Sequence, residues 1–125
     1  MEKKTSYGSL NTLMISFSNA FKGISEVFGR ERNMKIHMVL ACTAIILGIT
    51  LHLSRPEWIM IILCIGLVFT VEIINTAIER IVDLLSPEKK ELAGKAKDIS
   101  AGAVLIAAIT ASIIGLIIFI PHLLM

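Results

Sequence analysis

Four oxygen-bearing side chains recur at helical spacing in a stretch that is otherwise apolar: Glu72, Asn75, Glu79 and Asp83. At 100° per residue they fall within an arc of about 80° on one helix face. Carboxylate and amide oxygens are ligands that Mg²⁺ prefers, and Mg²⁺ usually completes its shell with water and phosphate oxygens. The spacing therefore predicts a polar stripe that can hold a divalent metal beside a phosphorylated substrate.

The first residue of this stripe, Glu72, follows the uncharged run from Trp58 to Val71. This run is long enough to cross a bilayer only if the helix continues past Glu72 to about Glu79. An acidic group at that depth costs about 2.5 kcal/mol and is kept there mostly for function. Because a carboxylate can accept the proton of an attacking hydroxyl, Glu72 is the candidate general base. Asn75 has an alternative interpretation as a hydrogen-bonding residue between helices.

Further charged side chains flank the apolar segments at the same expected level as the stripe: Glu31, Lys35, Lys95, Lys97 and Asp98. Phosphoryl transfer needs a metal and cations around the phosphate, and a group that orients the attacking hydroxyl. The sequence has neither a GxxxxGK[ST] phosphate loop nor a GxGxxG motif. The residues alone therefore predict a metal- and phosphate-handling site without a familiar nucleotide-binding fold.

The composition shows where such a site must be built. The chain has 125 residues, of which 55% are hydrophobic and 18% charged, and its mean hydropathy is +0.81. Soluble proteins average about 25% charged residues, and a soluble domain this small cannot bury so much apolar surface. We expect an all-α integral membrane protein. A disordered tail, a collagen, a disulfide-rich miniprotein and a nucleic-acid-binding arm are excluded, and no nucleic-acid partner is expected.

The predicted elements are one surface helix and three membrane spans. Apolar residues from Leu10 to Phe28 recur at helical spacing opposite a polar face, which favours a helix on the membrane surface. Packing against a partner helix is the alternative. No cleavable signal peptide is evident, so the chain is expected to keep its N-terminus. As one domain over 1–125, the expected organisation is an arm at 1–9, a surface helix at 10–30, and spans at 34–54, 57–85 and 97–120.

The distribution of basic residues predicts the orientation. Lysine and arginine concentrate before the first span and in the connection between the second and third, whereas the connection after the first span has only Arg55. By the positive-inside rule the N-terminus and the candidate site face the cytoplasm, and the C-terminus lies outside.

Small residues recur every four positions in the third span: Ala103, Ala107, Ala111 and Gly115. Such a stripe is expected to allow close helix packing within or between subunits. Cys42 and Cys64 are interpreted as packing residues, and His52 and His122 as residues of the outer interface. His37 lies near the membrane depth at which the polar stripe is expected, and its role is left open.

The stripe belongs to a longer pattern that resembles the signature of the prokaryotic diacylglycerol kinase family. The matching residues are Glu72 to Glu79, Asp83, Ala96-Lys97-Asp98 and Ala103-Val104, and the resemblance covers nearly the whole chain. It implies a homotrimer of three-span subunits in the bacterial plasma membrane, with active sites formed between subunits. It also implies ATP- and Mg²⁺-dependent phosphorylation of a membrane lipid alcohol by direct in-line transfer.

The resemblance also assigns roles to individual residues. Glu72 matches the catalytic base, Glu31 and Glu79 match metal-binding glutamates, and Asn75 and Lys22 match further motif or substrate positions. The positions that match nucleotide-site residues, or the loop that approaches ATP, are Asn19, Asp83, Glu88, Lys89, Lys90, Lys97 and Asp98.

Three departures indicate a branch within the family. Gram-negative members tend to have Arg, Glu and Ser where this chain has Thr12, His37 and Ala101. The chain is more similar to the Gram-positive branch, which implies undecaprenol as substrate, with diacylglycerol as the alternative. A remote alternative is a non-enzymatic interaction or pore protein. A pore would need acidic residues across the full membrane depth, whereas the stripe occupies one half.

Overall fold

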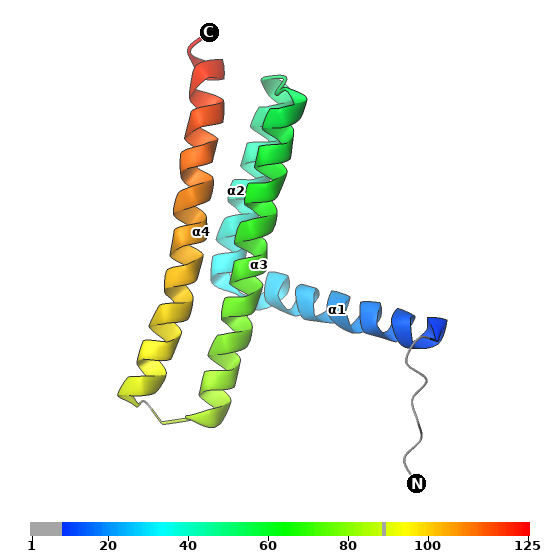
Figure 1. Ribbon diagram of the computed structural model, residues 1–125, viewed down its shortest axis with the longest axis vertical. Helices are drawn as coiled ribbons and strands as arrows, with labels where there is room; N and C mark the ends of the chain where they lie inside the picture. The colour runs from blue at the N-terminus through cyan, green and yellow to red at the C-terminus, as the bar shows by residue number, and fades with distance from the viewer. Residues whose placement is uncertain (1–8, 89) are drawn as a thin grey trace.

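The computed structural model describes residues 9–88 and 90–125, all of its secondary structure being helical. The helices are α1 (Leu10–Arg30), α2 (Arg32–Thr50), α3 (Arg55–Leu85) and α4 (Glu91–Leu123). The last three lie side by side as a bundle, and α1 projects sideways from it (Figure 1). The arm expected at 1–9 lies outside the described residues except for Ser9, whose hydroxyl oxygen caps α1 by accepting from the Thr12 N–H.

Helices α2, α3 and α4 are each long and apolar enough to cross a membrane. This confirms the prediction of an all-helical membrane protein with three candidate spans. The helices differ from the expected span limits at several ends. Helix α2 ends at Thr50, before the predicted limit at 54, while α4 begins at Glu91, six residues before 97. These additional turns of α4 carry charged residues and extend beyond its apolar part.

The connection between α2 and α3 is tight, as the sequence Ser54-Arg55-Pro56-Glu57 predicts. Ser54 and Glu57 form a reciprocal capping box, and Pro56 occupies the first turn, where its missing N–H is tolerated. Just before it, His52 adopts a left-handed backbone conformation with φ 55°. Gly48 allows the indole ring of Trp58 to lie close to the backbone of α2, because a Cβ at this position would lie 2.7 Å from Cη2 of Trp58.

At the other end of the chain, α4 continues through Pro121 to Leu123, past the predicted span limit at 120. A proline so near the helix end removes one backbone hydrogen bond from the final turns only. The same end of α4 is joined to the start of α3, because Nε2 of His122 lies 2.9 Å from Oε2 of Glu57.

Helix α1 contacts the bundle only near its C-terminal end. Val27 is its one buried residue in the described chain, and Phe28 stacks edge-to-face on Phe69 of α3 with ring centroids 5.1 Å apart. Most of its apolar face stays exposed, including Leu10, Leu13, Met14, Phe17 and Phe21. A single residue, Glu31, separates α1 from α2 and caps both helices.

Within the bundle, α3 packs along α4 and α2, with a small cluster of Leu53, Ile61 and Ile118 near the α2–α3 turn. The largest fully buried side chains are Met34 and Glu72. Glu72 is thus an ionisable side chain that is fully buried in the bundle, and the candidate active site lies around it.

Candidate active site

Glu72 lies in the middle of α3 with only 2% of its surface exposed. Nε2 of His37, on α2, lies 3.5 Å from its Oε2. This oxygen is buried and accepts no hydrogen bond from any residue in the described part of the chain. The hydroxyl of Thr76 donates instead to the backbone carbonyl of Glu72. The carboxylate therefore retains acceptor capacity for a proton or a donor on a substrate.

A cavity of about 250 Å³, named here the polar cavity, lies beside this carboxylate. Its polar lining comes from α2 and α3, and α4 closes it with small and aliphatic side chains such as Ala101 and Val104. The polar lining residues are Asn33, His37, Glu72, Asn75 and Glu79. Three members of the predicted stripe thus face one space.

Asn75 and Glu79 are linked inside this cavity. Nδ2 of Asn75 donates to Oε1 of Glu79 at 3.3 Å, which leaves the amide oxygen of Asn75 buried with no hydrogen-bond partner among the described residues. Buried polar atoms normally have partners, so two such oxygens, on Glu72 and Asn75, mark a place where a ligand would complete the bonding.

The fourth member of the stripe, Asp83, lies in a different hollow. A cavity of about 340 Å³, named here the loop cavity, is formed where α3 ends and α4 begins. Asp83 and Lys97 form an ion pair there, and Glu88 and Lys90 also line the space. The structure thus brings together four of the predicted nucleotide-site residues. Lys89 lies outside the described residues.

The remaining predicted residues lie apart from both cavities. Glu31 is contacted by Nη2 of Arg80 at 3.5 Å, and Nη1 of the same arginine lies 3.5 Å from Glu26. Within the described ranges, no three His, Cys, Asp or Glu side chains come close enough to hold a metal. Glu79 lines the polar cavity, whereas Glu31 is not among the residues that line it.

Three other predicted residues are exposed. Lys22 lines a hollow on the surface of α1, together with Glu26 and Arg30. Asn19 and Asp98 are both exposed to the surroundings of the bundle.

Two residues of the polar cavity were not assigned a role from the sequence: Asn33 and His37. Both lie near the start of α2, where neither belongs to a spaced motif. Their one sequence signal is that they are polar and stand at the end of an apolar segment.

The donor set of the two cavities fits a phosphate-bound Mg²⁺. This ion takes oxygen ligands and usually needs only one or two protein carboxylates when phosphates supply others. Glu79 and the unpaired Asn75 oxygen provide such atoms. Glu79 in the polar cavity and Asp83 in the loop cavity are one helical turn apart on α3, which is about 6 Å along the helix axis.

Comparison with known proteins agrees with this chemistry. The family model for prokaryotic diacylglycerol kinase matches residues 18–119. An undecaprenol kinase of Bacillus subtilis is 44% identical over 123 residues, covering 98% of this chain and 100% of the relative. A diacylglycerol kinase of Synechocystis is 38% identical over 98% of this chain and 70% of the relative. A diacylglycerol kinase of Escherichia coli is 34% identical over 82% of this chain and 84% of the relative.

Proposed function

The chain belongs to the prokaryotic diacylglycerol kinase family, whose members are lipid kinases, and we propose that its substrate is undecaprenol, phosphorylated with ATP as donor. The single observation that carries the proposal is the buried Glu72 carboxylate, which lies in a membrane-spanning helix and has an oxygen left without a hydrogen bond. The 44% identity to an undecaprenol kinase supports undecaprenol as acceptor.

The proposed reaction is a direct in-line transfer. The lipid hydroxyl oxygen attacks the γ-phosphorus of ATP, Glu72 accepts the hydroxyl proton, and ADP leaves with the electrons of the broken P–O bond. His37 is proposed as a positioning residue, because its ring lies 3.5 Å from the carboxylate that must face the hydroxyl. A fixed base and a fixed phosphate together convert the encounter of two substrates into a reaction within one site.

The phosphates of ATP are proposed to occupy the loop cavity. Lys97 would exchange its ion pair with Asp83 for contact with phosphate oxygens, and Lys90 would add a second positive charge. Glu79 and Glu31 are proposed to hold Mg²⁺, which spreads the charge of the transferring phosphoryl group when bound. Asn75 orients Glu79 through the hydrogen bond between their side chains.

We further propose that the active enzyme is a homotrimer in the plasma membrane. Helices α2, α3 and α4 expose many large apolar side chains, which lipid or neighbouring subunits must cover. Active sites formed between subunits would then bring together residues of neighbouring chains. The exposed apolar face of α1 is proposed to lie on the cytoplasmic surface of the bilayer, with the C-terminus outside.

The experiment that tests the proposal is a kinase assay on purified protein in detergent with ATP, Mg²⁺ and each of two lipids, undecaprenol and diacylglycerol. We expect transfer to undecaprenol at the higher kcat/KM. The two relatives named as diacylglycerol kinases favour the second candidate function, which a reversed preference would establish. Transfer to neither lipid would refute a lipid kinase.

A variant separates catalysis from binding in the same assay. Glu72→Gln keeps the size of the side chain but cannot accept the proton, so kcat should fall by about 10²- to 10⁴-fold. ATP binding, followed by the fluorescence of a labelled analogue, should be unchanged. A kcat near that of the wild type would remove Glu72 as base.

A further inference from the structure

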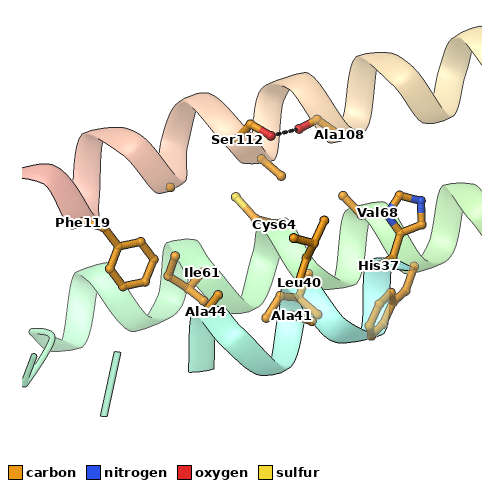
Figure 2. Close-up of a pocket in the computed structure, with 14 residues that line it drawn as sticks. His37, Leu40, Ala41, Ala44, Ile61, Cys64, Val68, Ala108, Ser112 and Phe119 are labelled. Atoms are coloured by element: carbon orange, nitrogen blue, oxygen red, sulfur yellow. Dashed lines mark hydrogen bonds between the residues drawn. The ribbon is translucent and has the colours of Figure 1, made fainter. Parts of the chain in front are cut away.

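A second cavity adjoins the polar cavity and leads away from it along the bundle. It lies between α2, α3 and α4, has a volume of about 230 Å³, and is named here the apolar cavity (Figure 2). Ala41, Cys64, Val68 and Phe119 are typical of its lining. The one hydroxyl in it, that of Ser112, donates to the carbonyl of Ala108 at 2.7 Å and is therefore already bonded to its own helix.

The apolar and polar cavities share part of their walls. His37 and Ala108 line both, and His37 is the residue that approaches Glu72. From this shared end, the lining continues on α4 as far as Phe119, a distance of about 16 Å at the rise of an α-helix. An apolar molecule in this space would have one end within reach of the candidate base.

Small side chains create the space. Ala44 on α2 and Ala111 and Gly115 on α4 line the apolar cavity. A Cβ added at Gly115 would meet nothing within 4 Å in the described part of the chain. Two members of the small-residue stripe of α4 therefore face a cavity instead of a tightly packed helix within the subunit.

We infer that the apolar cavity binds the part of the lipid alcohol chain that is nearest the hydroxyl. The hydroxyl itself then lies at the shared end of the two cavities, beside His37 and Glu72. This inference rests on the proposed function. A cavity of about 150 Å³ holds benzene, with six carbon atoms, so 230 Å³ has room for about nine carbons, or nearly two isoprene units. This volume corresponds to the first part of a single chain.

The benefit to the enzyme is orientation. Lipid tails are as apolar as the cavity walls, so a chain gains little by leaving the bilayer for the cavity. A chain held between three helices does, however, fix the direction from which its hydroxyl approaches Glu72. The value of kcat/KM should therefore depend on the carbon atoms closest to the hydroxyl and not on those farther along the chain.

A chain-length series tests this inference with the full protein in detergent. Substrates are 3-methylbut-2-en-1-ol, geraniol, farnesol and undecaprenol, which contain one, two, three and eleven isoprene units. We expect kcat/KM to rise at least tenfold from one unit to two and then to level off. A steady rise to the longest chain, or no dependence on length, would overturn the inference.

Two variants fill the cavity: Ala111→Leu and Gly115→Leu. Each should abolish the gain in kcat/KM between one and two isoprene units, so that geraniol is phosphorylated no more efficiently than 3-methylbut-2-en-1-ol. The matched control is Ala103→Leu, an exposed position of the same helix that lines neither cavity, and it should keep the full gain. Equal loss with every substrate, together with a changed oligomeric state on gel filtration, would show that a neighbouring subunit occupies the space and would overturn the inference.

A label on the unaltered protein avoids any question of misfolding. A geraniol analogue carrying a diazirine at its far end should mark peptides that contain the cavity lining around Cys64 and Gly115. Excess geraniol should protect them. Labelling confined to α1 would overturn the inference. If no alcohol in the series is phosphorylated, the proposed function fails, whereas phosphorylation without chain-length dependence refutes the cavity assignment alone.

Discussion

Replacing His37 by leucine tests whether the ring holds the candidate base in place. Nε2 of His37 lies 3.5 Å from Oε2 of Glu72, and this oxygen accepts no hydrogen bond from any residue in 9–88 and 90–125. Leucine fills a similar volume and offers no polar atom. The variant should therefore remove the imidazole that can stabilise the charge of the carboxylate.

The size of the effect follows from the geometry. A hydrogen bond to a charged group contributes about 1.5–3 kcal/mol, which corresponds to about 10- to 150-fold in rate. The Nε2–Oε2 separation of 3.5 Å is longer than the usual 2.9–3.0 Å, so the pair is a close polar contact and not a formed hydrogen bond. We therefore expect His37→Leu to lower kcat by about tenfold, at the lower end of that range.

The assay measures kcat and the KM for lipid and ATP separately. A residue that positions the base lowers kcat and leaves both KM values unchanged. His37→Gln, which retains an N–H donor, should recover most of the rate. Thr43→Leu is the control, since this residue is exposed on α2 and its hydroxyl donates only to the Val39 carbonyl. A kcat for His37→Leu within twofold of the wild type, or a loss that glutamine does not restore, would refute this reasoning.

Three more predictions concern the metal site and the bundle. Glu79→Ala should raise the Mg²⁺ concentration for half-maximal activity by about tenfold, and an unchanged titration would exclude Glu79 as a ligand. Gly48→Ala should destabilise the protein by about 1–3 kcal/mol through overpacking on Trp58, seen as a lower midpoint of unfolding in detergent. Gly66→Ala is its control, because a Cβ there meets nothing within 4 Å in the described chain; equal midpoints would contradict the expectation. Glu57→Gln retains the helix cap but loses the charge that faces His122, so its midpoint should fall less than that of Glu57→Ala, and a reversed order would count against the capping role.

The sequence alone is informative where local spacing determines structure. The helical period places Glu72, Asn75 and Glu79 on one face, and the structure has all three in one cavity. The apolar runs likewise predict the three candidate spans, because crossing a bilayer requires a minimum length of apolar helix. Ser54 and Pro56 mark the start of α3 by capping chemistry that acts over a few residues.

Features that depend on contacts between helices could not be predicted in this way. Asn33 and His37 enter the polar cavity because α2 packs against α3 in one particular rotation, and no local pattern sets that rotation. Arg80 meets Glu26 and Glu31 because α1 ends beside α3. The stripe of small residues on α4 has the spacing of a packing surface, and only the three-dimensional arrangement shows that part of it borders a cavity.

The junction between α1 and α2 has a mechanical consequence. Both are continuous α-helices, and Glu31 is the sole residue between them, with φ −84° and ψ 123°. Any change in the tilt of α1 must therefore be absorbed by rotation about the backbone bonds of this residue, and such rotation also moves its carboxylate. The guanidinium of Arg80 tethers that carboxylate to α3 and resists the rotation. The tilt of α1 is thus linked, through the backbone of Glu31, to the position of the Glu31 carboxylate, a candidate metal ligand.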